Sequence, residues 1–129
     1  LKNRYVGQVW KAIHHYEAIL RRKNIILAGD FNSNAIWDRK GRIGNHSDVV
    51  THLKKRKINS LYHLHHNENH GSETIPTFYL YKNKSKPYHL DYVFLSDAMI
   101  EHVSGFQLGS YEEWKPWSDH IPLIMQWFP

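Results

Sequence analysis

The first group of residues that could do chemistry is a short polar segment at the end of an apolar run. Residues 25–29 read Ile-Ile-Leu-Ala-Gly, and Asp30, Phe31 and Asn32 follow directly. Because residues two apart in an extended chain point to the same face, we expect Asp30 and Asn32 to project together at a strand end. An aspartate there could activate water or bind a cation, and an asparagine amide could hold a phosphate oxygen. The alternative is an Asx-type turn with a capping role.

Two later segments place further polar side chains beside apolar strands. Residues 89–96 read His-Leu-Asp-Tyr-Val-Phe-Leu-Ser, so Asp91 interrupts an apolar strand and needs a partner. Residues 118–122 read Ser-Asp-His-Ile-Pro, which places Asp119 and His120 side by side. Hydrolysis of a phosphoester needs a metal-binding carboxylate, an activated water and a cation near the phosphorus oxygens. The three segments together can supply all of these roles.

The three motifs, in this order, resemble the C-terminal half of the endonuclease/exonuclease/phosphatase (DNase I-like) superfamily. That family carries G-D-F-N, then a D-Y/H-x-F/L strand, then S-D-H-x-P, and this chain has AGDFNS, HLDYVFLS and SDHIPL. The helix-like residues 5–20 and the Pro-Thr pair at 76–77 also resemble the family's pattern. The resemblance implies an α/β fold, namely half of a DNase I-like four-layered α/β sandwich, with one mostly antiparallel sheet and helices on one side.

The resemblance also implies a role for each site residue. Asp30 corresponds to the residue that orients or deprotonates the attacking water, and Asn32 to the amide that steadies the phosphate. Asp91 is expected to pair with His120, so that the imidazole faces the phosphate as a cation. Asp119 corresponds to a ligand of Mg2+ or Mn2+, which are hard cations that prefer oxygen.

The function implied is that of a metal-dependent hydrolase of phosphoester bonds, a phosphodiesterase or nuclease. The alternative is a catalytically inactive basic module of the same fold that binds nucleic acid or a protein partner. The chain begins at Leu1 rather than Met, and residues 1–129 are expected to be the C-terminal part of a single domain whose N-terminal half is absent. The sheet face that the missing half would cover could then support self-association.

The pattern of apolar residues predicts the elements that position these motifs. Apolar residues at three- and four-residue steps predict an amphipathic helix over 5–20, and a second helix is expected from Asn45 or Ser47. The run 25–29 is typical of a strand buried on both faces. Further strands are expected at 60–65, 77–81, 89–96, 102–108 and 123–128.

The amino-acid composition indicates the charge of a binding partner but does not identify it. The chain has 17 Lys+Arg against 12 Asp+Glu, a formal net charge of +5, which favours an anionic partner such as nucleic acid. It has no cysteine, which excludes disulfides and thiolate metal sites. No run approaches the ~20 apolar residues of a membrane helix, so no membrane partner is expected. The compartment stays open, with the cytoplasm favoured.

The histidine-rich segment 63–70 raises a second kind of metal chemistry. Imidazoles suit zinc or nickel, and the segment resembles a piece of an H-N-H type nuclease. Its spacing fits no single helical or strand face beyond His63 and His65, and Gly71 follows it. We therefore expect a solvated loop there.

Overall fold

The computed structural model describes residues 5–129 as a mixed α/β fold whose strand pairs are all antiparallel. None of the helices in this part of the chain has the length and apolar character that a bilayer crossing requires. The helices and strands are, in chain order, α1 Tyr5–His15, α2 Glu17–Leu20, β1 Ile26–Asp30, η1 Ala35–Trp37, α3 His46–Lys54, β2 Ile58–Ser60, α4 Leu61–His66, β3 Phe78–Tyr79, η2 Leu80–Lys82, β4 Pro87–Tyr88, β5 Asp91–Ser96, α5 Asp97–Ile100, β6 Val103–Leu108, α6 Tyr111–Trp114 and β7 Leu123–Trp127.

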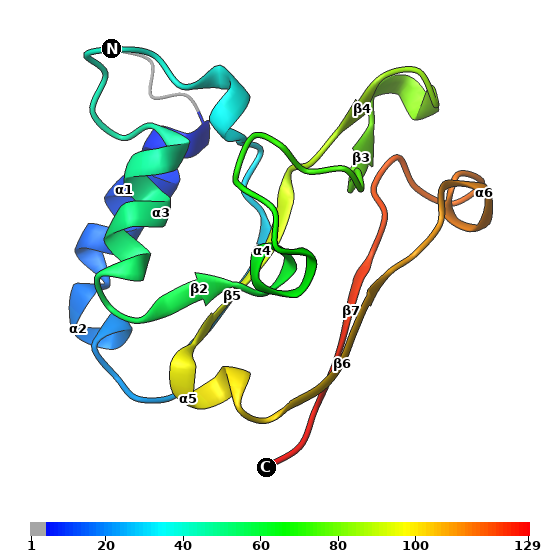
Figure 1. Cartoon of the computed structure of the whole chain (residues 1–129). Helices are drawn as coiled ribbons and strands as arrows, with labels where there is room; N and C mark the ends of the chain where they lie inside the picture. Colours follow the sequence, from blue (N-terminus) through cyan, green and yellow to red (C-terminus); the bar gives the residue numbers. More distant parts are fainter. Residues whose placement is uncertain (1–4) are drawn as a thin grey trace.

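The central sheet has the strand order β1-β5-β2, and helices α1 and α3 lie along one side of it (Figure 1). In β5, Tyr92 and Phe94 alternate with Asp91 and Val93, so the two pairs point to opposite faces. Tyr92 and Phe94 are buried in the main core, where apolar residues of α1 and α3 cover them. The members of this core are Val6, Ile13, Leu20, Ile25, Phe31, Val49, Leu53, Ile58, Tyr92 and Phe94. The helices therefore cover the face of the sheet opposite to Asp91.

Strand β1 differs from the expectation of a strand buried on both faces. It pairs with β5 alone among the described residues, and only Leu27 of its five residues is half-buried, the others being exposed. Ile26 is 50% exposed. The apolar run predicted a central strand, but β1 lies at the edge of the sheet and its second face is open. The helices cover one face, as expected, while a four-layered sandwich is not formed by the described residues.

The remaining strands form two further antiparallel pairs, β3 with β4 and β6 with β7. The β6–β7 pair lies beside the central sheet in Figure 1 and packs against a second cluster around Leu61, Leu95 and Met99. The expected strands at 89–96, 102–108 and 123–128 are confirmed as β5, β6 and β7, with shorter bounds. Instead of one sheet, the expected C-terminal strands are divided among three small sheets.

Two helical expectations need adjustment. The predicted helix over 5–20 is broken at Tyr16, where ψ is 22°, and becomes α1 and α2. The second helix, α3, begins after Asn45 as predicted, and the backbone N–H groups of Gly44 and Asn45 donate to the Asp48 carboxylate at 2.9 Å. A carboxylate in the first helical turn satisfies free donors and opposes the positive end of the helix dipole.

The prediction of a strand at 60–65 is wrong, because Leu61–His66 forms helix α4 directly after the short strand β2. Ser60 occupies the N-cap position and its Oγ forms a hydrogen bond with His63 Nδ1 at 2.7 Å. Leu61 and Tyr62 are both buried, which alternating strand faces would not allow against one core. Tertiary packing thus overrides the local preference of these residues.

Candidate active site

The centre of the candidate active site is a hydrogen bond between Asp91 on β5 and His120 in the loop before β7. Nδ1 of His120 lies 2.9 Å from Oδ2 and 3.2 Å from Oδ1 of Asp91. Since a carboxylate only accepts, Nδ1 is the donor and Nε2 is left free to face outward. Asp91 is 17% exposed and His120 33%, so the pair is half-shielded from water.

Asp30 joins this pair from the neighbouring strand. It lies opposite Asp91 in the β1–β5 register, and its Oδ2 is 4.0 Å from Nε2 of His120. The side chain of Asp30 is 40% exposed. The three side chains thus meet at one end of the β1–β5 pair, with His120 between two carboxylates. This arrangement can hold the imidazole in one orientation, and it leaves Asp30 accessible to water or substrate.

Asn32 is not brought to the same point. Its φ is +46°, so the chain has left the extended conformation on which the shared face depended. Its backbone N–H donates to Asp30 Oδ1 at 2.7 Å, which is the Asx-type turn named as the alternative. The exposed side chain of Asn32 borders a different hollow, which Ser33, Asn34, Trp37 and Arg42 also line.

Asp119 lies beside His120 but is half-buried in a connecting loop. Its backbone carbonyl accepts from the N–H of Tyr79 at 2.8 Å, which ties the loop to β3. Within residues 5–129, Asp119 does not combine with Asp30 or Asp91 into a group of three close enough to hold a metal ion. The assignment of Asp119 as a metal ligand therefore stays a prediction.

A hollow of about 340 Å³ opens next to the Asp91–His120 pair. Its lining combines the open face of β1 and β5 with the loop before β7, and its members are Ala28, Gly29, Asp91, Tyr92, Val93, Trp114, Ser118, His120, Ile121, Pro122 and Leu123. Ser118 shapes this loop, because its Oγ accepts from the N–H of His120 at 2.9 Å. A small group in this hollow would border Asp91, Ser118 and His120.

Thr77 is a positioning residue that the sequence alone did not single out. It is fully buried, and its Oγ1 accepts from the backbone N–H groups of Leu90 and Asp91 at 2.9 and 3.0 Å. Its carbonyl accepts from the N–H of Ile121 at 2.7 Å. One threonine therefore joins the strand that carries Asp91 to the loop that carries His120. The Pro-Thr pair in the sequence was the one signal for it.

The histidine-rich segment is also placed differently from the expectation of a solvated loop. The side chain of His63, on α4, is 9% exposed and that of Glu73 is 4% exposed. These residues lie on the helix-covered side of the sheet together with His46 and His70, whose rings are 5.0 Å apart. The expectation failed because the chain folds back after α4 and buries side chains that no single helical face would bring together.

The described chain thus defines an α/β protein with an aspartate–histidine–aspartate group at the open end of an antiparallel strand pair. A search against protein-family models finds no match for the sequence, and no curated protein gives a significant match. The case for function therefore depends on the geometry of the chain itself.

Proposed function

We propose that this chain is a metal-dependent hydrolase of phosphoester bonds, with a phosphodiester of nucleic acid as the favoured substrate. We also propose that it forms the C-terminal part of a domain of the endonuclease/exonuclease/phosphatase type. The main support for the proposal is that the imidazole of His120 lies between two carboxylates. Its Nδ1 is 2.9 Å from Oδ2 of Asp91, and its Nε2 is 4.0 Å from Oδ2 of Asp30.

The chain's own residues can carry out in-line attack of water on phosphorus. Asp91 accepts from Nδ1 of His120 and holds the ring so that Nε2 faces the position of a phosphate oxygen. Asp30 is near enough to His120 to border the same phosphate and accessible enough to orient or deprotonate the attacking water. Asn32, which the resemblance assigned to steady the phosphate, is given no part in this step because its side chain borders a different hollow.

The metal in this proposal is Mg2+ or Mn2+. Magnesium is commonly bound by one or two protein carboxylates together with waters and substrate phosphate, and it does not need a closed cage of protein ligands. Carboxylates at the open edge of a sheet suit such an ion, and Asp119 is the ligand that we assign to it. When bound, the ion would offset negative charge on the phosphorus oxygens.

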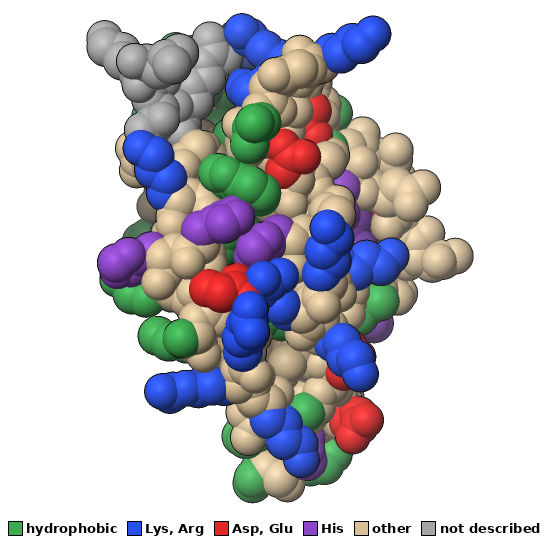
Figure 2. Space-filling view, turned by 90° about the vertical axis from the view of Figure 1, so that its left-hand side faces the viewer, with side chains coloured by type: hydrophobic (Ala, Val, Ile, Leu, Met, Phe, Trp, Pro, Cys, Tyr) green, Lys and Arg blue, Asp and Glu red, His purple; other side chains and the backbone are tan. Residues whose placement is uncertain are grey.

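Charge and aromatic exposure support a nucleic-acid substrate. The net charge of +5 attracts polyanions, although Figure 2 shows the Lys and Arg side chains of the helical side dispersed among acidic and histidine side chains. Trp114 lines the hollow beside His120, and Trp117, in the same loop, is 81% exposed. An indole beside a phosphoester site can stack on a base.

The second candidate is a basic binding module that keeps the fold without the chemistry. It is favoured by one observation, namely that Asp30, Asp91 and Asp119 do not form a metal-holding group within residues 5–129. A module of this kind would bind nucleic acid or a protein, and it would do so without a requirement for the imidazole of His120.

The decisive experiment is an assay of Mg2+- or Mn2+-dependent cleavage of plasmid DNA and of bis-para-nitrophenyl phosphate, with EDTA as the control. We expect turnover that falls by at least about 100-fold in His120→Ala, since a positioned acid–base group contributes about that much. His65→Ala is the matched control, because His65 is exposed on α4. The same assay is made with a version extended N-terminally to the full coding region. If both proteins bind DNA but cleave neither substrate, the binding module replaces the hydrolase proposal.

A further inference from the structure

A second constellation of ligating side chains lies on the other side of the sheet from Asp91. His46 is 1% exposed and His89 4%, and they lie close to His63, His70 and Glu73; these five residues are the buried histidine cluster. The hydroxyl of Tyr92 donates to the carbonyl oxygens of Ser33 and His89, which ties the cluster to β5. The phosphoesterase proposal uses none of these side chains.

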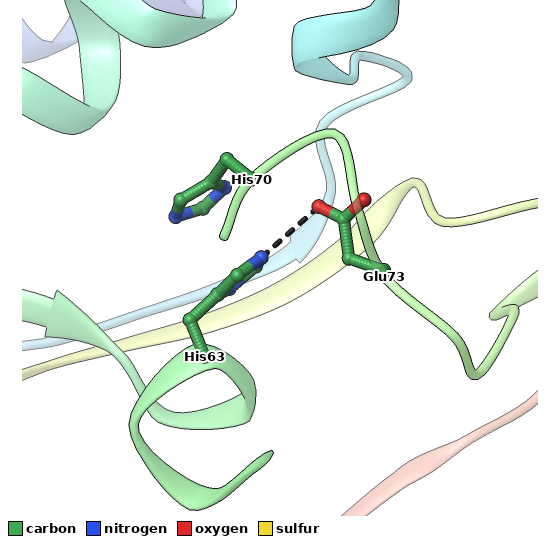
Figure 3. A group of neighbouring side chains, drawn as sticks. All are labelled: His63, His70 and Glu73. Carbon is green, nitrogen blue, oxygen red and sulfur yellow. Dashed lines mark hydrogen bonds and ion pairs between the residues drawn. The ribbon is translucent and has the colours of Figure 1, made fainter. Parts of the chain in front are cut away.

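The ligating atoms of three members converge. His63, His70 and Glu73 each offer one atom, and these atoms all lie within 4.8 Å of one another. Figure 3 shows His63 on α4 with His70 and Glu73 on the loop that follows, and its dashed line joins His63 Nε2 to Glu73 Oε1 at 3.0 Å. We propose that His63, His70 and Glu73 form a binding site for a transition-metal ion of the Zn2+ type, separate from the site of Asp91 and His120.

The other contacts of Glu73 favour a role as a metal ligand. Its Oε2 accepts from Asn34 Nδ2 at 3.1 Å and from the N–H of Gly71 at 3.0 Å. Both donors hold the same oxygen, and Oε1 is left facing His63. Hydrogen bonds of this kind orient ligating carboxylates in metal sites. The proton that joins Glu73 to His63 occupies the place that the metal would take.

The two imidazoles are held in a comparable way. Nδ1 of His63 bonds Ser60 Oγ at 2.7 Å, which leaves Nε2 as the ligating nitrogen. Nδ1 of His70 bonds Nε2 of His46 at 3.0 Å, and His46 in turn bonds Ser33 Oγ at 3.0 Å. Each ligand histidine therefore has its Nδ1 held by a hydrogen bond, as ligand histidines commonly do, and Nε2 of His63 bonds Oε1 of Glu73, another proposed ligand.

Two histidines and a glutamate suit Zn2+ better than Mg2+, since imidazole is a ligand of zinc, cobalt and nickel. Bonds of about 2.0–2.2 Å at a tetrahedral ion separate the ligand atoms by roughly 3.5 Å. The rings of His63 and His70 are stacked with centroids 3.5 Å apart, so the His70 ring must tilt for its nitrogen to point at the ion. His70 also borders an open hollow on the outer side of α3, whose other lining residues are Ser47, Val50, Thr51, Lys54 and Lys55.

The test is titration of metal-free protein with Zn2+ by calorimetry and with Co2+ by visible absorption. We expect one equivalent to bind, with the absorption spectrum of a four- or five-coordinate Co2+ ion and a rise in the melting temperature. Glu73→Gln and His70→Asn should each weaken binding by about 100-fold or more, because each removes one of three ligands. Circular dichroism and a cooperative melt would show that each variant is folded.

Two controls separate this site from other histidines. His65→Ala removes an exposed imidazole from the same helix, and His120→Ala removes the one at the Asp91 site; both should keep the Co2+ spectrum and the affinity. The proposal is overturned if the wild-type chain binds no Zn2+, if binding survives in folded Glu73→Gln and His70→Asn, or if His120→Ala abolishes it.

Discussion

Nδ1 of His120 lies 2.9 Å from Oδ2 of Asp91, although the two residues are 29 positions apart in the chain. The buried hydroxyl of Thr77 holds the backbone of Asp91, and the carbonyl of Thr77 holds Ile121, next to His120. Phe78 adds an aromatic contact at 4.7 Å from the ring of His120. Hydrogen bonds to Thr77 therefore fix the backbone on both sides of the pair, and this backbone sets the relative position of Asp91 and His120.

Replacing Asp91 tests whether this orientation matters for turnover. In Asp91→Asn the side chain keeps its shape, but one of the two oxygens that accept from Nδ1 of His120 is replaced by an amide nitrogen, so the ring is no longer held in one orientation. On the proposed hydrolase mechanism we expect kcat for bis-para-nitrophenyl phosphate to fall by about 10²–10⁴-fold, with a small change in KM. Asp97→Asn, at an exposed position at the start of α5, is the control. An unchanged kcat would contradict the assigned role of Asp91.

Removing the hydroxyl of Tyr92 should destabilise the fold. That hydroxyl is buried, lies 2.9 Å from the carbonyl of Ser33 and accepts from Asn34 Nδ2 at 3.2 Å, so Tyr92→Phe takes this donor from the Ser33 carbonyl and this acceptor from Asn34. We expect the free energy of unfolding in urea to fall by about 1–3 kcal/mol. Tyr81→Phe is the matched control, because Tyr81 is 81% exposed, and it should change stability by less than about 0.5 kcal/mol. Equal effects of the two changes would contradict this account.

Acid should weaken the contact between α2 and α3. Glu17 pairs with Arg21, His52 and Arg56, and hydrogen bonds, first of all from Arg56, lower the pKa of Glu17 to about 2. Because the folded-state pKa lies below the ordinary value of 4.5, the stabilisation is fully present above pH 4.5 and is lost as the pH falls toward 2.

The measurement is the melting temperature of wild type and Glu17→Gln between pH 7 and pH 2. Wild type should melt higher at pH 7, and the two curves should converge at the acid end of the range. Glu101→Gln, at an exposed position, should follow the wild-type curve. A difference between wild type and Glu17→Gln that stayed constant down to pH 2 would rule out the carboxylate as its source.

Two glycines give a matched test of close packing. Gly44 has φ +80° and Gly41 has φ +76°, so alanine is strained at both. A Cβ at Gly44 would lie 3.0 Å from Cγ of Trp10, whereas a Cβ at Gly41 would meet nothing within 4 Å. We expect Gly44→Ala to cost about 1 kcal/mol or more beyond Gly41→Ala in chemical denaturation, because the indole must shift. If both variants lost the same free energy of unfolding, the Trp10 side chain would be able to move aside without cost.

The sequence by itself was enough to predict an α/β chain, a helix that starts near Asn45 or Ser47, and three of the later strands. These features follow from local rules. A polar residue that can cap a helix and an alternation of period two are each visible within a few residues of the chain. The grouping of Asp30, Asp91 and His120 was implied instead by the resemblance of three ordered motifs, which placed Asn32 and Asp119 at the same site as well.

Only the tertiary structure decided the rest. It placed β1 at an edge with an open face, turned Asn32 away from Asp30 through a positive φ, and converted residues 61–66 into a helix. It also brought His63, His70 and Glu73 together on the helix-covered side of β5, where we expected a solvated loop in preference to a transition-metal site. These outcomes depend on which surfaces the chain buries when distant segments pack together. A local pattern cannot encode that choice, because the same residues satisfy it in more than one environment.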